Sequence, residues 1–360
     1  MYREEPASRR WPAVAFGCVV LVVLVLALAF GAARGTADAA SRAHDLASSG
    51  QYGAAVAMYR SVEDRTGPIY VFDQSDVKAA AMNAQRTMLQ WAQALGKADK
   101  ADQAVAMARA VTLPALASNV RETESSLLLG AAETAANRGD FDTALSRLQE
   151  LTQLGLAGTG PAAGHVPGLQ IAYLIADSQT LLSHGNGVGA VTALDSAAAM
   201  GAGGSAQAAP LLPAALLAEA DQEIGAGSFG EAVAALQRLV ASYSLTSQAR
   251  AARQLLAEGQ PVSGTLVDHA GAALAAQVRL SSHFTNEPGG YLTSGPFFYA
   301  DADASGNFRF ASIPVGGPYV FELFRAGNWE TFVDPDTGLP ANPVTVNPVT
   351  PVDLAFITVS

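Results

Sequence analysis

Apolar residues recur at helical spacing along most of this chain, and three stretches repeat one pattern in one register. Each stretch has a glycine, an aromatic residue two positions later and an alanine three positions after that, followed by apolar residues on one helical face. Repetition at a fixed register predicts stacked helical hairpins, because a single hairpin cannot bury its apolar face without a neighbour. The three copies are Gly50-Tyr52-Ala55, Gly139-Phe141-Ala144 and Gly227-Phe229-Ala232.

Two weaker copies, beginning at Asp99 and Gly185, complete a series whose intervals are 49, 40, 46 and 42 residues. Each interval has room for a helix before the turn, so we expect about five helical hairpins over residues 35–259, with Ser244–Glu258 as a capping helix. The stretches Gly155–Gly168 and Gly201–Pro213 are rich in Gly, Ala and Pro, and we expect loops or linkers there. The helices expected before the later turns are Asp76–Leu95, Glu122–Asn137, Gln170–Ser183 and Pro213–Ile224.

The first apolar stretch, residues 11–33, has no charged residue and is long enough to cross a hydrocarbon core of ~30 Å. It predicts one uncleaved transmembrane helix after a short cytoplasmic tail, residues 1–10. Cleavage after Gly31-Ala32-Ala33 is the alternative, although a signal peptide has a shorter apolar region of ~7–15 residues. Arginines are more numerous before the stretch than just after it, so the positive-inside rule places residues 35–360 outside the cytoplasm.

From Pro261 onward the apolar pattern has period two, interrupted by turn residues. It predicts an antiparallel β-sandwich over residues 261–360. An aromatic-rich segment, residues 282–301, is expected to fold back as a core or edge strand; a binding loop is the alternative, which makes Tyr291 and Phe297 candidate contacts for a partner or a glycan. Trp329, in residues 327–332, is a second candidate contact, for which packing is again the expectation. The clearest strands are Val262–Val267, Ala276–Ser282, Asn307–Ser312, Tyr319–Arg325 and Val352–Thr358.

The run Gly-Asp-Phe-Asp-x-Ala-Leu at residues 139–145 resembles the turn and second helix of a tetratricopeptide repeat, and residues 50–62 and 227–239 resemble further copies. The resemblance implies that the glycine permits the tight turn and that the aromatic residue and the alanine pack on the partner helix. The intervals exceed the ~34 residues usual for the family, and its first-helix Trp-Leu-Gly pattern is missing. A degenerate array, or a related helical solenoid, is what the resemblance implies.

Two stretches of the C-terminal region, Val262–Leu280 and Asp303–Phe321, resemble a carboxypeptidase regulatory-like domain. The second carries Asp-x-x-Gly-x-Phe-x-Phe, then Ile-Pro-x-Gly, then Tyr. The resemblance implies a transthyretin-like fold, an accessory module of secreted or surface proteins, and no peptidase activity. The alternation itself predicts that Phe308 and Phe310 share one sheet face and that Tyr319 and Phe321 share another.

Charge and composition exclude several classes of function. The net charge is −11, and because residues 1–34 hold four Arg and two Glu, the remainder carries −13, which disfavours nucleic-acid binding. The single cysteine, Cys18, lies in the apolar stretch, and the five histidines show no metal-ligand spacing. Asp301 and Asp303 resemble the start of a calcium loop, but Ser312 stands where a bidentate Glu is required. We expect no catalytic residue, no cofactor and no metal site.

Gly225–Gly230 matches the dinucleotide fingerprint G-x-G-x-x-G. That motif needs a strand before it, whereas here a helix is predicted, so we expect a repeat turn with Ser228 capping the next helix.

The sequence as a whole predicts a multidomain protein, α then β: a transmembrane helix, an α-solenoid and a β-sandwich. The function expected is a non-enzymatic, membrane-anchored adaptor or scaffold of the cell envelope, which binds a protein partner through the array and uses the sandwich as a spacer or second contact. Two alternatives stay open, a carbohydrate-binding envelope protein and a cytoplasm-facing secretion or chaperone adaptor. The Ala, Gly and Arg content favours a bacterial source, and the oligomeric state is not predicted.

Overall fold

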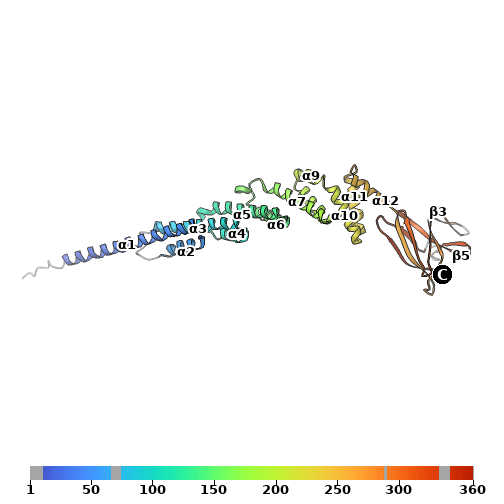
Figure 1. Cartoon of the computed structure of the whole chain (residues 1–360), viewed down its shortest axis with the longest axis horizontal. Coiled ribbons are helices and arrows are strands. Elements are labelled where there is room, and N and C mark those ends of the chain that lie inside the picture. Colours follow the sequence, from blue (N-terminus) through green and yellow to red (C-terminus); the bar gives the residue numbers. More distant parts are fainter. Residues whose placement is uncertain (1–10, 66–73, 288–289, 332–340, 360) are drawn as a thin grey trace, which may run out of the picture. The chain divides into compact units, whose positions relative to one another are not determined.

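The computed structural model describes residues 11–65, 74–287, 290–331 and 341–359. Within these residues, twelve α-helices come before eight β-strands (Figure 1). The predicted order, helices and then strands, is confirmed. The chain divides into two compact units, Met1–Tyr173 and Leu174–Ser360.

The first helix of unit 1, α1 (Trp11–Ser48), runs without a break from the predicted membrane span into the predicted first hairpin. The sequence suggested a boundary near Arg34, but the helix continues through Gly35 and Thr36, and no proline interrupts it there. A guanidinium nitrogen of Arg65 donates to Thr36 Oγ1 at 3.1 Å, which ties the middle of α1 to the residues just after the next helix.

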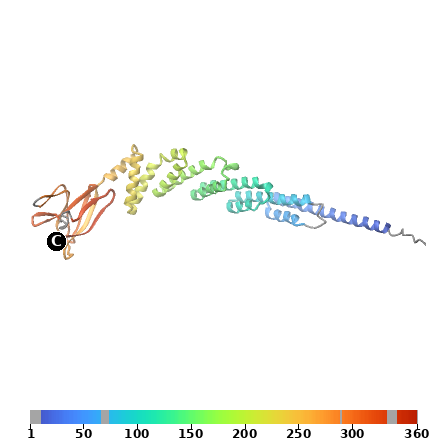
Figure 2. The same ribbon diagram turned by 180° about the vertical axis from the view of Figure 1, so that it is seen from behind.

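The helices that follow α1 in unit 1 pack on their neighbours in chain order (Figure 2). Their apolar faces form three successive clusters of buried residues, each shared by consecutive helices. Short 3₁₀ helices, η2 (Pro114–Leu116) and η3 (Gly160–Ala162), lie between longer ones. The α-helices are α2 (Tyr52–Glu63), α3 (Gln74–Lys97), α4 (Ala101–Arg109), α5 (Ala117–Asn137), α6 (Phe141–Gln153) and α7 (Val166–Ser183), of which α7 continues into unit 2.

The five predicted turns have the same backbone geometry. At each, the turn residue has a left-handed φ, which is 80° at Gly50, 60° at Asp99, 77° at Gly139, 75° at Gly185 and 79° at Gly227. The N–H of each turn residue bonds the carbonyl three positions back, and the N–H of the next residue bonds the carbonyl five positions back. This is the Schellman arrangement, which satisfies the last carbonyls of one helix before the next helix begins.

After each turn, the apolar positions expected to face the core are buried. The alanines five positions after the turn residue are all 0% exposed, so the facing helix can approach closely. The side chains nine and twelve positions after the turn residue are buried as well. The five alanines are Ala55, Ala104, Ala144, Ala190 and Ala232.

Unit 2 contains the remaining helices, whose buried side chains form one cluster together with Val349 of the β region. Its helix α9 (Ala202–Ala208) lies where a linker was expected, so that expectation was wrong. A helix forms there because α9 packs closely on α8. A Cβ at position 204 would collide with the Ala197 carbonyl oxygen, so only a glycine permits this approach. The other helices are α8 (Gly187–Ala199), α10 (Leu212–Ala226), α11 (Phe229–Ser242) and α12 (Ser247–Ala257), the last being the predicted capping segment.

The β region forms two sheets, with strand orders β4-β1-β8 and β3-β2-β5-β6, and β7 pairs with β5. All strand pairs are antiparallel except β1 with β8, which is parallel. The sequence predicted only antiparallel pairs, and the difference arises because the last strand returns beside the first. The strands are β1 (Gln260–Asp268), β2 (Gln277–Glu287), β3 (Gly290–Asp301), β4 (Asn307–Ile313), β5 (Gly316–Arg325), β6 (Asn328–Thr331), β7 (Pro343–Val346) and β8 (Val352–Val359).

One apolar core lies between the two sheets and takes side chains from both. Phe308 and Phe310 share a buried face of β4, and Tyr319 and Phe321 share a buried face of β5, as predicted. The rings of Phe308 and Phe321 have centroids 5.3 Å apart. The aromatic segment folds back as edge strand β3 and is not an open loop, which confirms the expectation for residues 290–301.

Candidate partner-binding surface

A groove in unit 1 follows one face of α3. Five side chains with hydrogen-bonding groups recur there at alternating intervals of three and four residues, which places them in one stripe along the helix. Over these residues a helix rises ~21 Å. The stripe is Asn83, Arg86, Gln90, Gln93 and Lys97, and all five residues line the same hollow.

This hollow has a volume of 580 Å³. Its other walls come from the end of α1, with His44 and Ser48, and from α2, with Tyr52 and Tyr59. Burial raises the pKa of the Tyr59 hydroxyl, and the nearby Asp45 carboxylate raises it further. Tyr59 is only 2% exposed, so it contributes to this wall mainly by packing.

A second hollow of 420 Å³ continues the groove from α3 to α5. The two hollows share Gln93 and Lys97, so they form one continuous surface. The α5 wall consists of four small residues, Ser126, Gly130, Ala131 and Thr134, together with Leu127.

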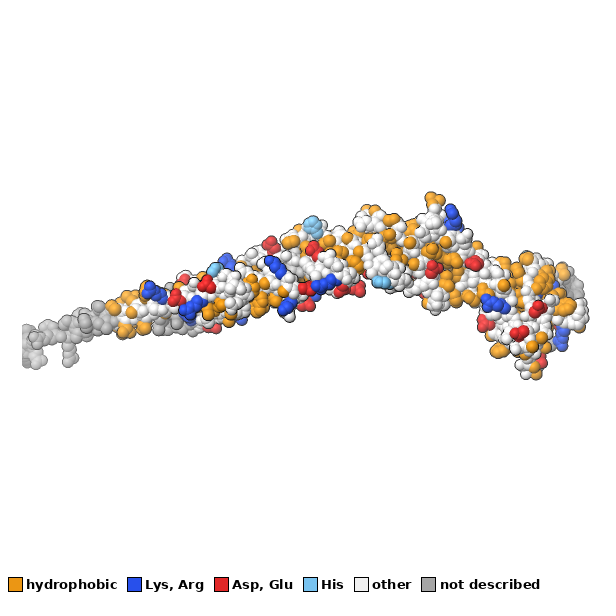
Figure 3. Space-filling model, in the orientation of Figure 1, with side chains coloured by type: hydrophobic (Ala, Val, Ile, Leu, Met, Phe, Trp, Pro, Cys, Tyr) orange, Lys and Arg blue, Asp and Glu red, His pale blue; other side chains and the backbone are white. Residues whose placement is uncertain are grey.

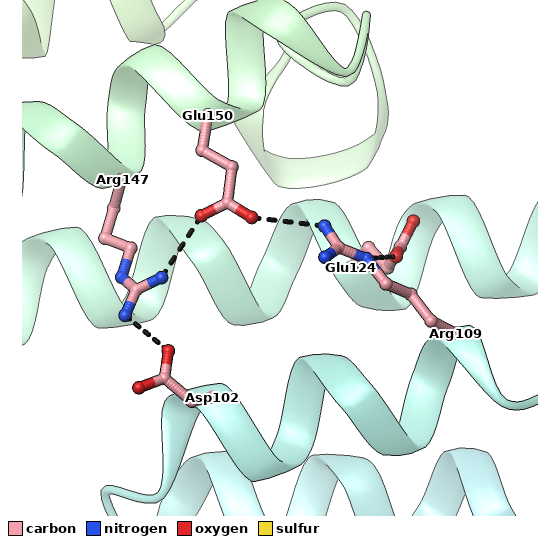
Figure 4. A network of polar contacts seen from close by, with 5 residues as sticks. All are labelled: Asp102, Arg109, Glu124, Arg147 and Glu150. Atoms are coloured by element: carbon pink, nitrogen blue, oxygen red, sulfur yellow. Dashed lines mark hydrogen bonds and ion pairs between the residues drawn. The ribbon is translucent and has the colours of Figure 1, made fainter.

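On the α4 and α6 side of unit 1, five charged residues form a connected network (Figure 4). Arg109 bonds Glu124 at 2.8 Å and Glu150 at 3.1 Å, while Arg147 bonds the other oxygen of Glu150 and also Asp102. The hydrogen bond to Glu124 raises the pKa of Arg109 above its ordinary value. The two guanidinium groups are therefore neutralised by three carboxylates, and this network fastens α4 to α5 and α6.

The aromatic residues of the repeat pattern are half-buried beside the turns, and the structure does not bring them together in one site. Tyr52 contributes to the wall of the groove. The ring of Phe141 lies 6.5 Å from that of Tyr173 on α7. Phe229 lies at the start of α11 in unit 2.

In the β region, two of the three candidate contact residues lie against one arginine. The guanidinium carbon of Arg279 lies 4.2 Å from the ring centre of Phe297 and 4.3 Å from that of Trp329. Arg279 also bonds both carboxylate oxygens of Glu322, whose side chain is only 2% exposed. A ring face is therefore covered by the protein's own cation at both positions. Tyr291 lies in β3, but its side chain is outside the described residues.

The residues that resembled a calcium loop and a dinucleotide-binding motif form turns with the nearby backbone. Asp303 Oδ1 accepts hydrogen bonds from the N–H groups of Ser305 and Asn307, which makes it part of a turn. The described residues contain no group of three or more His, Cys, Asp or Glu side chains that could hold a metal ion. Gly227 forms a repeat turn, and Ser228 occupies the N-cap of α11 without the predicted side-chain cap.

The described part of α1 exposes a continuous apolar surface at its start. Its Leu, Val and Phe side chains from Leu21 to Phe30 are about half exposed, from 49% at Val25 to 65% at Leu21. Figure 3 shows these hydrophobic side chains beside the grey residues. In the part of the chain whose side chains are described, α1 is the one helix long and apolar enough to cross a membrane, by length and composition.

Comparisons with known proteins add little to this picture. No protein-family model matches the chain, and no curated protein matches it. Among solved structures, the crystal structure of PilW, described as a widely conserved type IV pilus biogenesis factor, aligns with 60% of this chain and 97% of its own. The identity is 13% and the TM-score 0.20, values too low to establish a shared fold.

Proposed function

We propose that this protein is a non-enzymatic, membrane-anchored adaptor or scaffold of the cell envelope that binds a protein partner in the groove along α3. The observation that carries the proposal is the open stripe of polar side chains on α3, continued by the small residues of α5. Amide and cationic groups at regular helical spacing suit an extended polypeptide better than a compact small molecule. No catalytic residue is assigned.

Repetition is the reason for assigning this role to the helices. The five matching turns and the buried alanines support a degenerate tetratricopeptide-like solenoid, in which each pair of helices rests on the next. Gly50, Gly139 and Gly227, with the aromatic and alanine residues that follow them, have a packing role in this proposal. The polar residues of the stripe on α3 are not among these packing residues, so they are available to bind a ligand.

The β region is assigned an accessory role as a spacer or second contact. The Asp303–Phe321 resemblance, together with a core shared by two sheets, supports a carboxypeptidase regulatory-like sandwich. The glycan alternative requires open ring faces at Phe297 and Trp329. Arg279 lies over both rings, so no observation favours that alternative.

Site-specific photo-crosslinking in intact cells tests the adaptor function. A photoreactive residue replaces Gln90 in the groove, and a control variant carries it at Gln153, which is exposed on α6. We expect a discrete crosslinked protein from position 90 that is not captured from position 153. Capture should persist when residues 261–360 are deleted.

Equal capture from both positions, or none from position 90, would contradict binding in the groove. Capture that disappears with the β region, and that contains glycan, would favour the carbohydrate-binding alternative instead.

A further inference from the structure

We propose that the groove along α3 binds an acidic, extended segment of the partner, with two acidic side chains about five residues apart. This inference rests on the adaptor function proposed above and names the chemistry of its ligand. Three features of the groove support it: its charge, the spacing of its side chains and its position beside the end of α1.

The charge of the groove is opposite to that of the chain. Among the described residues that line the two hollows, Arg86 and Lys97 are cationic and none is Asp or Glu, while the nearest carboxylate that acts on the lining is Asp45, beside Tyr59. The whole chain carries −11. A cationic lining in an acidic protein attracts anionic segments and disfavours basic ones.

The two cations of the groove have no ion-pair partner among the described residues, although other arginines of the helical region do. Arg109, Arg138, Arg147 and Arg238 each bond a carboxylate. Arg86 and Lys97 are exposed and extend from the same face of α3. They are therefore available to an external carboxylate.

Spacing sets the expected pattern in the ligand. Arg86 and Lys97 are eleven positions apart on one helix, which corresponds to ~16–17 Å. An extended chain advances ~3.3 Å per residue, so this span matches about five residues. Gln90 and Gln93 lie between the two cations and can both donate to and accept from the ligand backbone.

The groove also begins close to the proposed membrane span. His44 follows Phe30, the last of the exposed apolar side chains, by fourteen residues of the same helix, or ~21 Å. A partner segment in the groove would consequently lie near the membrane surface. This position favours a ligand segment that is acidic and lies next to the membrane anchor of the partner.

The test is selection from a displayed library of random dodecapeptides on the full-length protein held in lipid nanodiscs. We expect enrichment of peptides with two Asp or Glu residues four to six positions apart. The variant Arg86→Gln/Lys97→Gln should bind the selected peptides about tenfold more weakly, equivalent to 1.4 kcal/mol. A matched control, Lys78→Gln/Arg250→Gln, removes the same charge outside the groove and should leave binding unchanged.

Three outcomes would overturn the proposal: enrichment of neutral or basic peptides, enrichment of none, or equal loss of binding in the control variant. A charge reversal, Arg86→Glu, adds a positive test because it should select peptides in which one acidic position has become Lys or Arg. Crosslinking from Gln90 remains independent of these results. Capture of a partner through a segment without acidic residues would reject this inference and leave the adaptor function standing.

Discussion

Asp99 shows how strongly a single turn position is constrained in this fold. It takes the left-handed φ of the four glycines at the equivalent turns, although it has a Cβ. Aspartate tolerates this conformation better than most residues, and its carboxylate bonds Arg138 of the following turn at 2.5 Å. The turn therefore forms without a glycine, and the weaker copy could still be predicted because the apolar residues after it, from Ala104 to Val111, keep the repeat register.

Replacing Gly139 by Ala isolates the conformational requirement of the turn. The added methyl group would meet nothing within 4 Å, so the expected loss of ~1–2 kcal/mol comes from φ alone. Gly130→Ala is the control, because this glycine is inside α5 and also has open space at its Cβ position. The control should gain ~0.5–1 kcal/mol. Urea unfolding followed by circular dichroism measures both, and equal effects would refute the turn geometry.

Glu219 on α10 gives a prediction that depends on pH. Burial raises its pKa, Asp195 and Glu223 add to the rise, and Arg238 opposes it. A carboxyl group whose pKa is raised on folding stabilises the fold at low pH, and this contribution is lost as the pH rises through the folded-state pKa. Glu219→Gln should therefore raise the melting temperature at neutral pH, with little difference below about pH 4. The exposed Glu231→Gln variant makes the same charge change, and an equal increase there would reject burial as the cause.

At the scale of elements, the spacing of apolar residues predicted most helices and strands. The elements that it did not predict include helix α9 and the short strands β6 and β7. The five strands with clear alternation are present, because alternation directly reflects one buried face. Helix α9 was missed because glycine and alanine indicate a linker by composition, yet their small size lets α9 pack on α8. Strands β6 and β7 have only four residues each, too few for a periodic signal.

The outer face of the larger sheet depends on one buried ion pair between β2 and β5. Removing one partner leaves the other charge buried, so Glu322→Leu should destabilise the β region by ~3–5 kcal/mol. The double variant Arg279→Met/Glu322→Leu removes both charges and should recover most of that loss. Thermal unfolding followed by near-ultraviolet circular dichroism measures the change. A double variant as unstable as the single one would show that Arg279 acts mainly through its stacking on Phe297 and Trp329.

At the scale of the whole molecule, the sequence indicated the order of its parts but not the groove. The α3 stripe has a regular spacing that could have been found by inspection. Its meaning depended on α1, α2 and α5, whose side chains form the other walls of the groove only once the chain has folded. The ion-pair network was hidden for the same reason, since its five members come from three helices.

Membrane attachment and orientation are predictions about the full chain. We expect it to stay with the membrane fraction in alkaline carbonate, and a variant lacking residues 1–34 to be released. A protease added to intact spheroplasts should cleave the β region if residues 35–360 lie outside the cytoplasm. Cleavage only after lysis would instead support the cytoplasm-facing orientation, and release of the full chain by carbonate would exclude an uncleaved span.

The continuity of α1 has a mechanical consequence. A proposed membrane span and a wall of the groove belong to one helix, so the helical phase of the span sets the direction in which the groove faces. One residue inserted near Arg34 would turn that wall by about 100° around the helix axis and lift it by ~1.5 Å. Two inserted turns would restore the facing direction at a greater height. A neighbour that packs on one face of the span would therefore set, through α1, the direction in which the groove faces.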